Sequence, residues 1–101
     1  MTVLRSLQFL EFSDTEVEDL TPLRWLASIR YLDLSSTYVR DLIPLAGLTT
    51  LQTLLLDQTD VSNLSPLAGL SDLQYLDISR TRVRDLTPLR INKRVRITKG
   101  S

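Results

Sequence analysis

The chain has 101 residues, of which 43% are hydrophobic and 24% are charged, a composition typical of one small globular domain. It contains no cysteine and no histidine, which excludes a disulfide framework, thiolate metal sites and the most common general base. No apolar run approaches the roughly 20 residues that cross a bilayer, and the first residues lack the pattern of a signal peptide. We therefore expect a cytoplasmic protein with no membrane span.

The formal net charge of zero conceals two parts of opposite sign. Residues 1–79 carry four arginines and eleven acids, a balance of −7, whereas residues 80–101 carry eight basic residues and one acid, a balance of +7. The basic residues of the second part are Arg80, Arg82, Arg84, Arg90, Lys93, Arg94, Arg96 and Lys99.

A repeat of 22 residues organises the chain, and residues 48–69 show it most clearly. The sequence matches itself at this spacing four times without a gap, at residues 4–25, 26–47, 48–69 and 70–91. The final residues, 92–101, break the pattern and predict a C-terminal cap strand in which Val95 and Ile97 face inward. The first copy has no such cap before it, so we expect a single repeat domain that is part of a longer protein, or one whose first edge is covered by a partner or by another copy of the chain. The equivalent positions define columns, such as Leu10, Leu32, Leu54 and Leu76, or Pro22, Pro44, Pro66 and Pro88.

Two different periods occur within each copy. The segment around Leu32 and Leu34 alternates apolar and polar residues, which predicts a half-buried strand. The segment at 42–45 places apolar residues three apart around Pro44, which favours a single tight turn or a short 3₁₀ segment. A unit this short cannot bury its own leucines, so neighbouring copies must stack into a solenoid with one continuous core.

The turns of each copy carry recurring polar and small residues. A threonine follows each strand, and we interpret its hydroxyl as a structural ligand of backbone groups. An Asp or Asn precedes each Leu-x-Pro turn and is expected to cap its free N–H groups. We interpret Gly47 and Gly69 as giving the backbone freedom to enter the next strand. The threonines are Thr15, Thr37, Thr59 and Thr81, and the caps are Asp19, Asp41, Asn63 and Asp85.

The consensus L-x-x-L-x-x-L-x-L-x-x-T-x-V-x-x-L-x-P-L-x-x resembles the leucine-rich repeat family over residues 4–90. It is most similar to the short bacterial class that occurs in internalins, with threonine where many members have asparagine. The resemblance implies an α/β-type solenoid of four repeats plus a C-terminal strand. A curved parallel sheet would line its concave face, with short 3₁₀ turns or loops on the convex face. It also implies a module that binds other proteins.

The side chains that flank the inward leucines are expected on the concave face, because side chains alternate along a strand. They form an aromatic column beside an acidic one, and Leu55 interrupts the acidic column. Aromatic anchors surrounded by charge are typical of protein-binding hot spots, although aromatics also favour strands and acids keep a sheet soluble. The predicted partner-binding residues are Phe9, Glu11, Tyr31, Asp33, Leu55, Tyr75 and Asp77.

Other functions have weaker support in the sequence. An open sheet without histidine offers no pocket that would raise the pKa of one carboxyl, so we expect no enzyme and no catalytic residue. No phosphate-binding glycine loop or metal-ligand spacing occurs, so we expect no cofactor and no metal. The first alternative to protein or peptide binding is head-to-tail self-association of the acidic and basic ends. The second is binding of an anionic polymer by the basic segment, although the absence of interleaved aromatics argues against nucleic acid.

Overall fold

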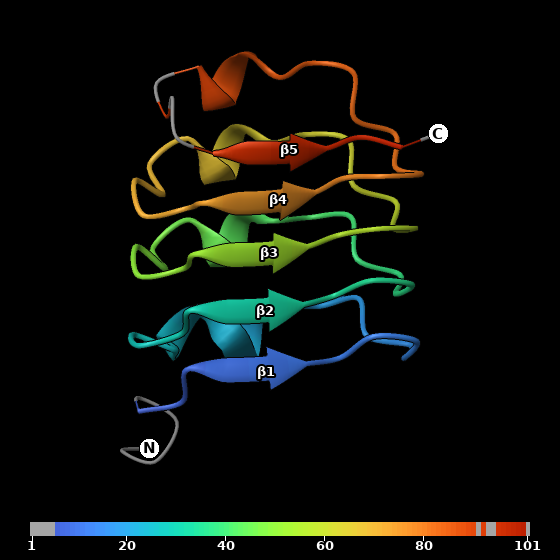
Figure 1. Cartoon of the computed structure of the whole chain (residues 1–101). Helices are drawn as coiled ribbons and strands as arrows, with labels where there is room; N and C mark the ends of the chain where they lie inside the picture. Colours follow the sequence, from blue (N-terminus) through green and yellow to red (C-terminus); the bar gives the residue numbers. More distant parts are fainter. Residues whose placement is uncertain (1–5, 91, 93–94, 101) are drawn as a thin grey trace.

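A computed structural model describes residues 6–90, 92 and 95–100. Within them the chain forms a solenoid in which short strands alternate with 3₁₀ segments, and all five strands form one parallel sheet in sequence order (Figure 1). The solenoid and the C-terminal strand predicted from the sequence are therefore confirmed. The ends of the predicted repeat array, Leu4 and Ile91, and Lys93 and Arg94 of the basic segment lie outside the described residues. The elements are β1 (Phe9–Glu11), η1 (Thr21–Trp25), β2 (Tyr31–Asp33), η2 (Ile43–Leu45), β3 (Thr53–Leu55), η3 (Ser65–Leu67), β4 (Tyr75–Asp77), η4 (Thr87–Leu89) and β5 (Arg96–Thr98).

The strand register follows the 22-residue period through the first four strands. Leu10 pairs with Leu32, Leu32 with Leu54, and Leu54 with Leu76, so every inward column is in step. The last step is one residue shorter, because Leu76 pairs with Ile97 at a spacing of 21. Ile97 and its neighbour Val95 pack against the core as predicted, although both remain half-buried.

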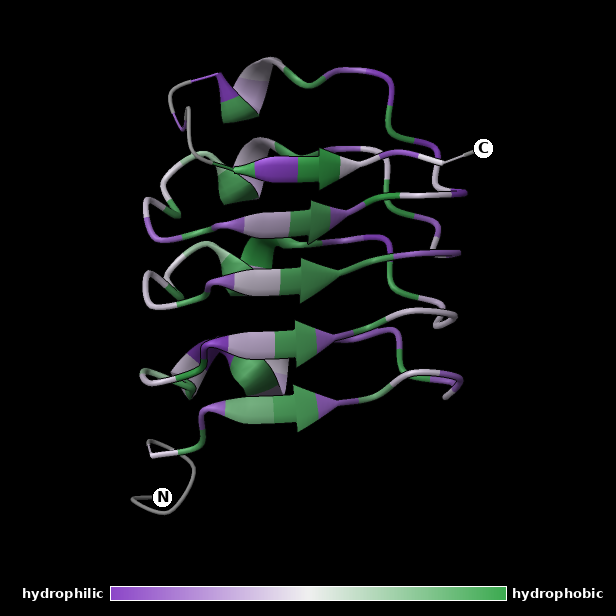
Figure 2. Cartoon of the chain, in the orientation of Figure 1, coloured by the Kyte–Doolittle hydropathy of each residue, from purple (hydrophilic) through white to green (hydrophobic). Residues whose placement is uncertain are grey.

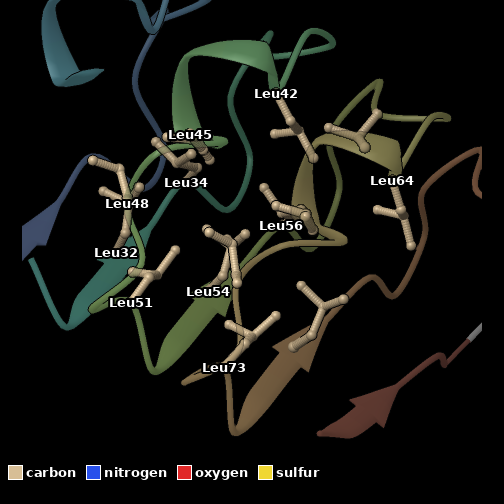
Figure 3. Close-up of a cluster of buried hydrophobic side chains, with 14 of the residues drawn as sticks. Leu32, Leu34, Leu42, Leu45, Leu48, Leu51, Leu54, Leu56, Leu64 and Leu73 are labelled. Carbon is tan, nitrogen blue, oxygen red and sulfur yellow. The ribbon is translucent and has the colours of Figure 1, made fainter. Parts of the chain in front are cut away.

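The core lies between the sheet and the 3₁₀ segments, and it consists almost entirely of leucine (Figure 3). Figure 2 shows a hydrophobic residue at the equivalent place in each strand. Leu32, Leu54 and Leu76 are 0% exposed, whereas Leu10 of the first coil is only partly buried. Most of the apolar side chains of the first coil, which has a described neighbour on one side only, are therefore less completely buried than their equivalents in the central coils.

Each 3₁₀ segment contains one proline, and η2, η3 and η4 are single turns of three residues whereas η1 has five. The N–H of Leu45 donates to the carbonyl of Leu42 at 2.9 Å, and that of Leu67 donates to Leu64 at 2.9 Å, which is the three-residue spacing of a 3₁₀ helix. The proline follows the first residue of each segment, where its fixed φ fits and its missing N–H removes no bond. The predicted Asp and Asn caps are confirmed, because their Oδ1 atoms accept the N–H two residues later at 2.9–3.0 Å.

The recurring threonines make the backbone contacts that the sequence predicts. Each hydroxyl donates to the carbonyl three residues earlier, at distances of 2.6–2.8 Å. Thr37 and Thr59, in the central coils, are about 5% and 4% exposed, so the bond satisfies a carbonyl that water does not reach. These threonines are structural.

One position of each coil has a left-handed backbone that the sequence did not indicate. The residue before each threonine has φ between 54° and 60°, although none is glycine. Its N–H continues the hydrogen-bond ladder into the next coil, at 3.0 Å from Gln58 to the Ser79 carbonyl, for example. A non-glycine residue in this region costs on the order of 1 kcal/mol, and the ladder bond offsets that cost. The four residues are Asp14, Ser36, Gln58 and Arg80.

The role predicted for Gly47 and Gly69 is wrong. Neither has a positive φ, and a Cβ at either position would meet no atom within 4 Å. In the first coil Trp25 occupies the same position and makes the same turn, its carbonyl accepting the N–H two residues later at 2.9 Å as that of Gly47 does. The backbone here requires no glycine.

We predict that Leu54→Ala lowers the free energy of unfolding by about 2–5 kcal/mol, because the deleted atoms leave a cavity in a core closed on both sides. The measurement is urea denaturation at equilibrium. Leu55→Ala is the matched control, because Leu55 is the next residue of β3 and is only half-buried; we expect it to cost less than about 1 kcal/mol. Equal losses in the two variants would contradict the placement of Leu54 in the core.

Candidate functional site

The concave face of the sheet brings the predicted partner-binding residues together in two columns. Because the strands pair in register, each column runs straight across the sheet. The aromatic column is Phe9, Tyr31, Thr53 and Tyr75, and the acidic column is Glu11, Asp33, Leu55 and Asp77.

The first two aromatic rings of the column stack on each other. The centroids of Phe9 and Tyr31 are 4.2 Å apart, and their planes are inclined by 5°. The Phe9 side chain nevertheless remains 56% exposed. The pair is therefore a flat apolar platform that faces solvent, of the kind that provides contact area at low entropic cost.

The environment of Tyr31 raises the pKa of its phenol. Partial burial is the largest cause, and the negative charges of Asp33 and Glu11 add to it. All three effects disfavour the phenolate anion. Tyr31 is thus a neutral hydrogen-bond donor at physiological pH.

The sequence did not place Arg96 and Thr98 in the columns, although β5 extends both. Arg96 pairs with Tyr75, and Thr98 pairs with Asp77. The Tyr75 hydroxyl and Thr98 Oγ1 share a hydrogen bond of 2.7 Å, which holds the ring. A fixed 22-residue spacing misses these residues because the last step is 21. The sequence predicted that Val95 and Ile97 face the core. Because side chains alternate along a strand, this already implied that Arg96 between them faces the concave side.

The acidic column is less available to a partner than the sequence predicts. Asp33 is only 9% exposed, and its Oδ1 accepts the Ser35 N–H at 2.9 Å. Asp77 makes the equivalent bond to Ser79 at 2.9 Å. These carboxylates therefore close the turn after their strands, and Asp33 is not an exposed acid. Glu11 is exposed.

An ion pair lies beside the columns, between the third and fourth coils. The guanidinium of Arg80 lies 2.6 Å from Asp57 Oδ2, with the two side chains 52% and 22% exposed. Pairs this exposed contribute little to stability. The ion pair nevertheless removes one arginine from the free basic surface.

The acidic side chains of the described residues are dispersed, and some of them close turns. No group of three or more metal-binding side chains occurs there, and the two turn-closing aspartates already accept backbone N–H groups. Repeat solenoids commonly use an extended surface of this kind for binding.

The chain is a leucine-rich-repeat protein. A family model described as "Leucine Rich repeats (2 copies)" matches residues 49–90, and the parallel sheet and 3₁₀ turns have the geometry of that class. More particularly, it is related to the repeats of bacterial internalins. Modules of this kind generally mediate protein interactions and are typically non-catalytic.

Three solved structures have a similar fold, and two of them are internalins. An internalin (inlF) of Listeria monocytogenes is 27% identical with a TM-score of 0.88, and the match covers 94% of this chain and 28% of that chain. Internalin C2 of the same organism is 39% identical with a TM-score of 0.77, and the match covers 94% of this chain and 53% of that chain. A leucine-rich-repeat protein of Leptospira interrogans is 23% identical with a TM-score of 0.76, and the match covers 90% of this chain and 25% of that chain. This similarity shows the fold alone.

The chain spans about half the length of internalin C2 and about a quarter of the other two. No curated protein matches it significantly. Across the part that the structure describes, no helix is long and apolar enough to cross a membrane.

The raised pKa of Tyr31 gives a prediction. Asp33→Asn keeps the Oδ1 acceptor but removes a charge that raises this pKa, so the pKa should fall toward the ordinary value of 10.0. Absorbance of the tyrosinate, with Tyr31→Phe identifying the signal, measures it. Asp77→Asn is the matched control. An equal fall of the Tyr31 pKa in both variants would contradict the assignment of part of the shift to the nearby charge of Asp33.

The same shift has a consequence for stability. The folded protein binds the phenolic proton of Tyr31 more tightly than the unfolded chain does. The stabilising contribution of this proton to the free energy of unfolding is therefore complete below about pH 10, the pKa of an unfolded tyrosine. It is lost as pH rises through the folded pKa.

Proposed function

We propose that the chain is a non-enzymatic interaction module whose concave face binds a protein or peptide. The observation that supports this best is the stacked Phe9–Tyr31 pair, which leaves Phe9 56% exposed on that face. The fold gains little from exposing an apolar ring, whereas a partner could desolvate it.

The composition of the surface suggests the chemistry of the partner. Glu11 and the half-buried Asp77 lie beside the aromatic column, while Arg96 extends that column at the opposite edge of the sheet. A partner segment with a basic residue over the first coil and an apolar or aromatic side chain over Phe9 and Tyr31 would match this pattern.

The wider setting of the module also stays a proposal. We propose a single repeat domain, with repeats 4–25, 26–47, 48–69 and 70–91 and a cap at 92–101, that is part of a longer protein. The partial coverage of the solved relatives is compatible with this. The cytoplasmic location remains a prediction.

We predict that Tyr31→Ala and Tyr75→Ala each weaken partner binding by about 1–2 kcal/mol or more, while the thermal unfolding midpoint changes little. Peptides selected from a displayed random library on the unmodified domain provide the ligands. Calorimetry then compares their affinities for the variants.

Tyr38→Ala is the matched control for this experiment. Tyr38 is 58% exposed but lies outside the strands of the sheet, so its removal should leave affinity unchanged. Selected ligands that bind both concave-face variants as tightly as the original protein would refute the concave-face site.

Self-association is the second candidate function, and one observation favours it. Leu7, Leu10, Phe12 and Val17 of the first coil are only partly buried, although the same columns are 0–1% exposed in the second and third coils. At the other end Val95 and Ile97 are also half-buried. The acidic first coil and the basic last coil are complementary in charge.

Sedimentation velocity over a range of protein and salt concentrations tests this candidate. Stacking driven by charge should give larger species at low salt that dissociate as the salt concentration rises. Charge reversal at Arg82 and Arg84, both exposed, should have the same effect. A monomer at every concentration and at low salt would refute it.

Binding of an anionic polymer by the basic segment remains a prediction. Lys93 and Arg94 lie outside the described residues, and Arg80 is paired with Asp57. No observation favours this function over concave-face binding or self-association.

A further inference from the structure

Two residues on the convex face depart from their columns in the same direction. Trp25 occupies the position that is glycine in the next two coils, at Gly47 and Gly69, and isoleucine in the fourth coil, at Ile91. Ile43 occupies the position of Thr21 in the first coil, and the two later coils have Ser65 and Thr87 there. In each case a large apolar residue replaces a small or hydroxyl-bearing one.

These two substitutions lie at one groove, between η1 and η2. The groove has a volume of about 400 Å³ and is lined by Thr21, Arg24, Trp25, Asp41, Ile43 and Gly47, among others. Trp25 is 65% exposed and Ile43 is 67% exposed. Gly47 contributes no side chain, and the space where its Cβ would lie is empty to 4 Å.

Neither apolar side chain is needed by the fold. The turn at Trp25 is the same one that Gly47 and Gly69 make, with equivalent carbonyl bonds of 2.9, 2.9 and 3.0 Å. The N–H of Ile43 is capped by Asp41 at 3.0 Å, as that of Ser65 is capped by Asn63 at 2.9 Å, so the side chain at this position is free to vary. Both side chains therefore expose apolar surface to water without stabilising the turns in which they lie.

A cation borders the groove. The guanidinium carbon of Arg24 lies 4.9 Å from the centroid of the Trp25 ring, a cation–π contact that orients the indole. Among the described residues the only ion pair within 4.0 Å is Arg80–Asp57, so Arg24 makes no direct ion pair there. The other charged residue that lines the groove, Asp41, already accepts the Ile43 N–H. A guanidinium without a direct ion pair retains N–H donors for a carboxylate of an incoming ligand.

We propose that this groove, which we call the convex groove, binds a protein segment in which an aliphatic side chain lies next to a carboxylate. The aliphatic group enters the space over Gly47, between the indole of Trp25 and the side chain of Ile43. The carboxylate meets Arg24. Because the core separates the convex groove from the concave sheet, this site is independent of the proposed concave-face site, and both can be occupied at once.

Trp25 is the single tryptophan of the chain, so its fluorescence reports directly on the convex groove. The probe is N-acetyl-L-leucine, which combines an aliphatic side chain with a carboxylate. A ligand of this size should bind with a dissociation constant on the order of 1–10 mM. We expect a saturable blue shift of the emission, because the ligand excludes water from the indole.

Three comparisons make the experiment decisive. N-acetyl-L-leucinamide, which lacks the charge, should bind at least threefold more weakly, and Arg24→Gln should abolish this difference. Gly47→Leu fills the floor of the convex groove and should remove the shift. Gly69→Leu makes the same change one coil further on, where the added side chain also finds open space, and should leave the shift intact.

The unfolding midpoints of both glycine variants show that the domain remains folded. No saturable shift at tenfold higher probe concentration would overturn the proposal. Equal binding of the acid and the amide would overturn the assigned chemistry, and an equal loss in Gly47→Leu and Gly69→Leu would overturn the location. None of these results depends on the concave face.

Discussion

Register between neighbouring coils is the constraint on which the rest of this structure depends. A 22-residue coil buries none of its apolar side chains alone, and Leu54 reaches 0% exposure only because Leu32 and Leu76 pair on either side of it. The parallel hydrogen bonds fix that pairing, and they continue past each strand into the left-handed residue that follows. A shift of one residue would turn the leucines outward along a whole coil.

The same register gives the surface its functional meaning. Because each position recurs in every coil, a residue that the fold requires is recognised by its recurrence, as with the threonine bonds of 2.6–2.8 Å. Variation alone does not indicate a site, since exposed positions vary freely. Exposed apolar groups held in place by a neighbour are more informative. Phe9 stacked on Tyr31 and Trp25 beneath Arg24 are the two such cases described here.

The sequence predicted the core, the strands, the 3₁₀ turns, the threonine bonds and the caps, because each of these recurs at a fixed spacing with a clear physical reason. It also predicted which residues align in columns across the sheet, whereas their role in binding stays a prediction. It failed where the answer depends on three-dimensional neighbours. Asp33 appears exposed by alternation, yet it folds back on the Ser35 N–H and is buried. The convex groove joins residues of two adjacent coils, which no single repeat reveals.

The glycines and the final strand failed for other reasons. Gly47 suggested backbone freedom, but its φ is not positive, and its importance lies in the side chain that it lacks. The sequence did not place Arg96 and Thr98 in the two columns, because the last coil is one residue shorter than the repeat of 22 residues. The left-handed positions, such as Gln58, carry no glycine to indicate them, and they are stabilised by bonds to the next coil.

Hydroxyl-radical footprinting of the domain, with and without a bound protein partner, tests the assignment of the binding face most directly, because aromatic side chains react in proportion to their exposure. Protection of Phe9 and Tyr31, with Tyr38 unchanged, is the result expected if the concave sheet is the binding face. Protection of Tyr38 while Phe9 and Tyr31 react as they do in the free domain would contradict it.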